Sequence, residues 1–67
     1  MKFNEWLRKA RLENCLSQRE LADALGVTTP TICNLETGKT KPRLDVQKRI
    51  CEFFNIETKE LNKMMEE

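Results

Sequence analysis

Apolar residues recur every three or four positions along most of the chain, which is the spacing of amphipathic helices and not the alternation of strands. The first segment of this kind carries one stripe of four residues: Trp6, Leu7, Ala10 and Arg11. Asn4 is a suitable N-cap before the stripe, and Asn14-Cys15 ends it. The pattern therefore predicts a first helix between Asn4 and Asn14.

The second helix has a signal at each of its ends. Ser17 and Glu20 have the spacing of a capping box, in which each side chain accepts a hydrogen bond from the backbone of the other residue. Leu16 and Leu21 are spaced as a hydrophobic staple around this cap. Gly26 suits a left-handed residue at the C-terminal end. A helix over about residues 17–25 is expected, with its buried stripe formed by Leu21, Ala22 and Leu25.

The third helix follows after a short turn. Thr28 is placed to cap it, Pro30 lies in its first turn, where a missing amide hydrogen costs nothing, and Gly38 ends it. A helix over about residues 28–37 is expected. Its inward positions are Ile32, Leu35 and Glu36, and its outward positions are Thr29, Thr31 and Asn34.

Two more helices complete the pattern. Pro42 lies within a basic loop, Lys39–Arg43, so the fourth helix begins near Leu44, and it ends at Asn55. Its apolar stripe is Val46, Ile50, Phe53 and Phe54, where Phe53 is assigned to the core, with a dimer surface as the alternative. A fifth helix from Glu57 or Thr58 to Met64 buries Leu61. The predicted fold is all-α, a compact five-helix domain that spans residues 1–67 as a single unit.

Composition removes several classes of function. A chain of 67 residues buries only about 60% of its unfolded surface, so a deep enclosed pocket is not expected. The absence of histidine removes Ser-His and Cys-His nucleophile pairs and His-bearing zinc sites, and no enzymatic activity is expected. No apolar run approaches the ~20 residues of a membrane-spanning helix, and none resembles a signal peptide. A cytoplasmic protein without cofactor, metal or membrane partner is expected.

The three cysteines, Cys15, Cys33 and Cys51, are odd in number and form no C-x-x-C pair. Neither a disulfide framework nor a zinc cluster is therefore indicated, and reduced thiols are expected. The sequence assigns these residues no function.

The net charge of +1 conceals an uneven distribution. Residues 35–51 carry five cations and two anions, whereas residues 52–67 carry two cations and five glutamates. The middle of the chain is therefore suited to face a polyanion, while the acidic C-terminal segment points elsewhere.

Two capped helices joined by Leu25-Gly26-Val27-Thr28 form a helix-turn-helix unit, whose second helix can project its outer face into the major groove of DNA. The wider pattern is Leu16-Ser17-Gln18, Leu21-Ala22, Leu25-Gly26-Val27-Thr28, Ile32, Leu35-Glu36, Gly38 and Pro42. From about Leu7 to Leu61, the chain resembles the Cro/XRE family, the DNA-binding domains of lambda-type phage repressors and many small bacterial regulators. The resemblance implies a lambda-repressor-like fold and a transcriptional repressor, encoded by a bacterium or phage and nucleoid-associated, that binds palindromic operator DNA as a homodimer.

The resemblance also implies individual roles. Bases in the major groove are contacted from the positions of Gln18, Thr29, Pro30, Thr31 and Asn34. Phosphates are contacted from the positions of Ser17, Gln18, Thr28, Lys39, Lys41 and Arg43. The family commonly joins its first and third helices by a partly buried ion pair, at the positions of Arg11 and Glu36. A dimer surface is placed at the fifth helix, with Phe53, Met64 and Met65, or at a second patch, Phe3 and Trp6.

The chain departs from the family pattern at three positions. Cys15 stands where a glycine is usual, Arg43 replaces a small polar helix cap, and Gln47 replaces a large apolar residue. Two alternatives to the repressor stay open. One is an antitoxin or restriction-modification controller of the same fold, and the other is a protein–protein interaction module that has lost DNA binding.

Overall fold

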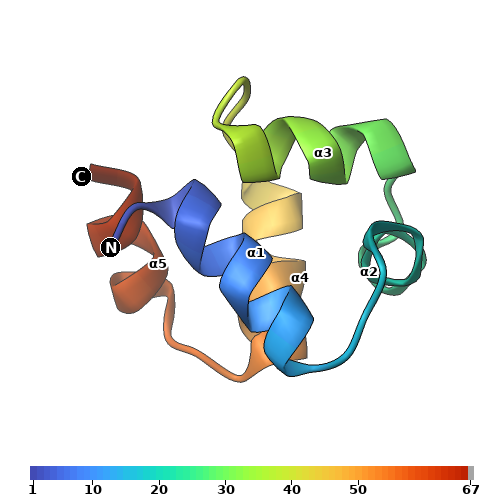
Figure 1. Ribbon diagram of the computed structural model, residues 1–67. Coiled ribbons are helices and arrows are strands. Elements are labelled where there is room, and N and C mark those ends of the chain that lie inside the picture. Colours follow the sequence, from blue (N-terminus) through green and yellow to red (C-terminus); the bar gives the residue numbers. More distant parts are fainter. Residues whose placement is uncertain (67) are drawn as a thin grey trace.

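The computed structural model describes residues 1–66, which form five helices and no strand. The elements are α1 (Phe3–Glu13), α2 (Gln18–Leu25), α3 (Thr29–Thr37), α4 (Leu44–Phe54) and α5 (Thr58–Glu66). Helix α3 lies along one edge of the molecule, α1 and α4 lie beneath it, and α2 and α5 occupy opposite ends (Figure 1). The predicted all-α, five-helix architecture is confirmed.

The core forms where the inward stripes of all five helices meet. Its fully buried side chains are Leu7, Leu21, Leu25, Ile32, Leu35, Ile50 and Leu61. Burying one such side chain favours folding by about 1.5–3 kcal/mol before conformational entropy is counted. Every helix contributes at least one of these residues, so no helix packs independently of the others.

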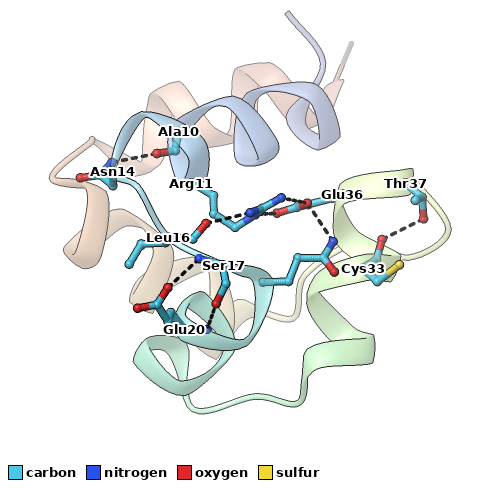
Figure 2. Close-up of polar contacts among 10 residues, drawn as sticks. Ala10, Arg11, Asn14, Leu16, Ser17, Glu20, Cys33, Glu36 and Thr37 are labelled. Atoms are coloured by element: carbon cyan, nitrogen blue, oxygen red, sulfur yellow. Dashed lines mark hydrogen bonds and ion pairs between the residues drawn. The ribbon is translucent and has the colours of Figure 1, made fainter.

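The capping box of α2 is present as the sequence predicts (Figure 2). The Glu20 backbone N–H donates to Ser17 Oγ at 3.0 Å, and the Ser17 N–H donates to Glu20 Oε1 at 2.9 Å. The Ser17 backbone N–H, and secondarily its hydroxyl, hold the pKa of the Glu20 carboxyl below its ordinary value. Gly26 ends the helix in the left-handed conformation, with φ +70°. The start and end of α2 are therefore fixed by local chemistry.

The ends of α3 follow the sequence less closely. Thr28 occupies the N-cap position, but its hydroxyl oxygen lies 2.8 Å from the hydroxyl of Thr31 and bonds to no backbone amide. At the other end Gly38 is left-handed, with φ +81°, and the Lys39 N–H turns back to donate to the Asn34 carbonyl at 3.0 Å. The C-terminal end of α3 thus leads directly into the basic loop.

Two sequence-based assignments are wrong. Asn4 is not the N-cap of α1. The helix begins earlier in the chain, at Phe3, whose ring is buried in the core, and Lys2 takes the cap position. Phe53 is not a core residue: it is 43% exposed, and Cys51 fills the buried position on α4. The ring of Phe53 instead packs edge-on against Phe54, with ring centroids 4.9 Å apart. Helix α5 also extends two residues beyond its expected end, to Glu66.

A buried ion pair between Arg11 and Glu36 joins α1 to α3, as the resemblance implies (Figure 2). Arg11 Nε lies 2.7 Å from Glu36 Oε2 and Arg11 Nη2 lies 3.1 Å from Oε1, while Nη1 donates to the Leu16 carbonyl at 2.8 Å. The two side chains are only 9% and 2% exposed. The hydrogen bond to Glu36 raises the pKa of Arg11, against the opposing effect of burial. One guanidinium therefore fixes α1, α3 and the segment that enters α2.

Replacing Glu36 with alanine is expected to destabilise the protein strongly, because Arg11 then remains buried without its anion. Loss of one partner of a buried pair costs about 3–5 kcal/mol of unfolding free energy. Urea unfolding followed by circular dichroism measures this loss. The matched control is Glu13→Ala, since Glu13 is an exposed carboxylate on α1 and its loss is expected to cost less than about 0.5 kcal/mol. An unfolding midpoint for Glu36→Ala equal to that of the control would contradict this account.

Replacing Cys15 with glycine is expected to stabilise the protein. Cys15 is exposed and left-handed, with φ +57°, a conformation that costs an L-residue roughly 1–2 kcal/mol. Glycine avoids this cost but loses more backbone entropy on folding, so a net gain of about 0.5–1 kcal/mol is expected. Thermal unfolding measures it, with Cys33→Ala, at an exposed helical cysteine, as the control for thiol loss. A lower melting temperature for Cys15→Gly would show that the left-handed cysteine is not strained.

Candidate nucleic-acid interface

The two faces of α3 differ in polarity, as its sequence predicts. Ile32, Leu35 and Glu36 are buried against the rest of the molecule. Pro30 is exposed, and the other three outward positions are half-buried: Thr29, Thr31 and Asn34. Glu36 is the one charged residue within α3, and its carboxylate faces inward to Arg11. The outer face of α3 is therefore polar and uncharged.

The basic loop after α3 is anchored at both of its ends. At its start, the backbone N–H groups of Lys39 and Thr40 donate to the Asn34 carbonyl at 3.0 and 3.4 Å. At its end, Pro42 is buried, and its carbonyl accepts a hydrogen bond from Gln47 Nε2 at 3.0 Å. Gln47, the polar residue at a usually apolar position, thus fastens the loop to α4. The backbone that carries the exposed cations of the loop is thus held next to α3.

A groove of about 570 Å³ separates α3 from the beginning of α4. Its polar wall includes Thr28, Thr31 and Asn34 from the α3 side and Lys41, Arg43 and Arg49 from the loop and α4. Asp45 also lines it, so the cations outnumber the anion by three to one. The groove places hydroxyl and amide groups directly beside positive charge.

The remaining predicted site residues lie outside this groove. Thr29 and Pro30 occupy the first turn of α3, and Lys39 begins the loop. Ser17 is the N-cap of α2 and Gln18 is its first residue. The Ser17 oxygen accepts from the Glu20 N–H, and the hydroxyl keeps its own hydrogen for donation. Gln18 is half-buried, and its Nε2 donates to Glu36 Oε1 at 3.2 Å. The structure thus ties one predicted contact residue to the buried ion pair.

Arg49 is a groove residue to which the sequence assigned no role. Its Nη1 donates to the Leu25 carbonyl at 2.9 Å, where it satisfies the C-terminal end of α2. A Cβ atom on Gly26 would lie 2.9 Å from this nitrogen, so glycine leaves room for the arginine as well as adopting its left-handed backbone. The two partners are 24 residues apart, and the packing of α4 against α2 brings them together.

Other sites are sparse in residues 1–66. The described helices include none that is long and apolar enough to cross a membrane. Among the same residues, His, Cys, Asp and Glu side chains do not gather in a group of three that would suit a metal ion. Cys51 is buried, and desolvation, with a smaller contribution from Glu52, raises the pKa of its thiol, whereas Cys15 and Cys33 are exposed.

Known proteins share the sequence pattern over most of the chain. The activator BcrR of Enterococcus faecalis, an HTH-type transcriptional activator, is 38% identical over 61 residues, which cover 91% of this chain and 30% of that protein. The cryptic phage CTXphi transcriptional repressor RstR of Vibrio cholerae is 30% identical over 59 residues, or 88% of this chain and 53% of that protein. The chain thus spans about a third to a half of the length of these relatives.

A solved structure shares the fold. The clp gene regulator ClgR of Corynebacterium glutamicum superposes with a TM-score of 0.77 over 94% of this chain and 67% of that chain, at 21% sequence identity. The sequence model of the helix-turn-helix family matches residues 7–61, the span that contains the motif residues. With the pattern, the architecture and the match in agreement, this chain belongs to the helix-turn-helix family.

Proposed function

We propose that this chain is a sequence-specific, DNA-binding transcriptional regulator that inserts α3 into the major groove. The observation that carries the proposal is the groove in which Thr31 and Asn34 of α3 lie beside Lys41 and Arg43. Groups that can read base edges are there contiguous with cations that can neutralise phosphates, which is the combination that specific DNA binding requires. The names of BcrR and RstR, a transcriptional activator and a transcriptional repressor, support the same function.

Base reading is assigned to short, uncharged side chains. The Asn34 amide offers a donor and an acceptor, which suit a bidentate contact to adenine. The methyl groups of Thr29 and Thr31 and the ring of Pro30 can pack on thymine methyls, and Gln18 reaches a base at the edge of the site. Pro30 is exposed, and the other four side chains are half-buried: Gln18, Thr29, Thr31 and Asn34. In this proposal they reach the base edges together when α3 enters the major groove.

Phosphate contacts supply most of the affinity in this proposal, because the reading face has no charge of its own. Lys39, Lys41 and Arg43 are exposed cations in an anchored loop. The Thr28 hydroxyl is exposed at the start of α3. Ser17 and Gln18 lie at the N-terminal end of α2, where the helix dipole favours an anion. Each neutralised phosphate steepens the salt dependence of binding by about 0.9 in log–log slope.

The complex is proposed to be a homodimer on a palindromic operator, and the regulator a repressor. A single module buries about 600–1,000 Å² on DNA, and two copies double this contact. Exposed Phe53 packs against half-buried Phe54, Phe54 packs against Trp6, and Trp6 lines a shallow hollow with Met64. This aromatic surface is assigned to the dimer contact. Residues 1–67 are proposed to act as one DNA-binding unit without catalytic activity, at the bacterial nucleoid in the cytoplasm.

Selection of bound duplexes from a random pool, repeated at several salt concentrations, tests this function. The purified protein is expected to enrich one palindromic sequence, with affinity that falls steeply as salt rises. Enrichment of a single asymmetric half-site would refute the homodimer and leave the DNA-binding proposal intact. Failure to enrich any sequence, with salt-insensitive association, would refute DNA binding and favour the interaction module.

Replacing Asn34 with alanine is expected to weaken binding to the selected duplex by about 1–3 kcal/mol and to relax the preference at one base pair. The unfolding free energy should change little, because the Asn34 carbonyl, not its side chain, anchors the loop. Fluorescence anisotropy on the selected duplex and on single-base variants measures the effect. The control Asn62→Ala, at an exposed asparagine on α5, should bind as the unsubstituted protein does. Equal weakening on every duplex would contradict a base contact by Asn34.

A further inference from the structure

The contact between Gln18 and Glu36 connects the predicted DNA face to the buried ion pair. Gln18 Nε2 lies 3.2 Å from Glu36 Oε1, the same oxygen that accepts from Arg11 Nη2 at 3.1 Å. Glu36 belongs to the last turn of α3, whereas Gln18 is the first residue of α2. A buried carboxylate thus holds a side chain at the start of the neighbouring helix.

The chemistry of this contact determines which edge of the amide lies against Glu36. The carboxylate is paired with a guanidinium and carries no hydrogen, so it can only accept hydrogen bonds. The Gln18 atom that approaches it must therefore be the amide nitrogen. The amide oxygen is itself an acceptor, and it would face an acceptor oxygen of Glu36 with no hydrogen between them. With its nitrogen held inward, Gln18 directs its carbonyl Oε1 away from the ion pair.

We infer that Glu36 is a positioning residue for DNA reading, which fixes Gln18 with Oε1 outward so that Gln18 selects a base bearing an exocyclic amino group. In the major groove these groups are the N6 of adenine and the N4 of cytosine, whereas guanine and thymine present oxygen acceptors at the same place. Gln18 therefore prefers adenine or cytosine over guanine or thymine on the strand it faces. The inference rests on the proposed function and adds a specificity role for a residue that never touches DNA.

The rigidity of the pair explains why Glu36 is suited to this role. Its side chain is 2% exposed and is held by two hydrogen bonds from Arg11, whose third bond goes to the Leu16 carbonyl two residues before Gln18. The carboxylate and the backbone that carries Gln18 are thus fixed by the same guanidinium. A glutamine on a solvated helix start would instead sample both amide orientations.

The test combines binding and spectroscopy on Gln18→Ala, Glu36→Gln and the double variant, with Glu13→Gln as the control for loss of one exposed carboxylate from α1. Gln18→Ala first identifies the base pair that Gln18 reads. At that base pair, Glu36→Gln is expected to reduce the preference for adenine or cytosine by about three- to tenfold, the range of one hydrogen bond. In the Gln18→Ala background the same substitution should have no further effect on preference. A reduction that is equal on all duplexes, or that persists without Gln18, would overturn the inference.

A second measurement needs no DNA and no substituted carboxylate. In the ¹⁵N–¹H spectrum of the unsubstituted protein, one Gln18 side-chain amide proton should be shifted downfield and exchange slowly, unlike the exposed amide of Asn62. Two Gln18 amide protons at random-coil shifts would overturn the positioning role even if operator binding is found. A shifted proton in a protein that binds no duplex would instead leave the positioning intact and refute the proposed function.

Discussion

The arrangement of the helices that matter here depends on one buried guanidinium. Arg11 satisfies both oxygens of Glu36 on α3 and the carbonyl of Leu16 before α2, so a single side chain sets how the two helices of the motif meet α1. Desolvating two charges costs several kcal/mol per ion, and such a pair is retained only where its hydrogen bonds offset that cost. Here the three hydrogen bonds of Arg11, at 2.7, 2.8 and 3.1 Å, offset the desolvation. Within residues 1–66, no buried side-chain nitrogen or oxygen is without a hydrogen-bond partner. Through the same guanidinium, the segment before α2 is hydrogen-bonded to the side chain that pairs with α3.

The candidate DNA-binding surface contains two kinds of group in separate places. The outer side chains of α3 are short and uncharged, while the cations lie in a loop whose two ends are hydrogen-bonded to α3 and α4. Phosphate contacts position a protein on DNA and base contacts specify the sequence. In the proposed complex, affinity and specificity would therefore be set by different residues of this surface. Arg49 has both a structural contact and a place in the groove. Its Nη1 donates to the Leu25 carbonyl at the C-terminal end of α2, and its side chain lines the groove. The aromatic surface around Phe53 involves α1, α4 and α5 and leaves the groove open.

The sequence predicts this structure well wherever a few neighbouring residues decide the outcome. The capping box of Ser17 and Glu20 and the left-handed glycines at the ends of α2 and α3 are short-range effects, and they occur as expected. The sequence fails where distant packing decides: the buried ring of Phe3 moves the start of α1, and Phe53 is displaced from the core by Cys51. Of the candidate site, the polarity of α3 and the exposure of the loop cations could be predicted. The contacts of Gln18 with Glu36 and of Arg49 with Leu25 join residues 18 and 24 positions apart, and no local pattern encodes them.

In the proposed complex, the start of α2, the outer face of α3 and the anchored loop together form the surface that meets DNA. The most direct measurement is a titration of ¹⁵N-labelled protein with its selected duplex, followed residue by residue through amide shifts. The largest changes are expected at Gln18, along residues 29–34 and over residues 39–43. Changes that centre on the Glu5, Arg8 and Leu12 side of α1 or on Lys59–Lys63, with α3 and the loop unaffected, would contradict it.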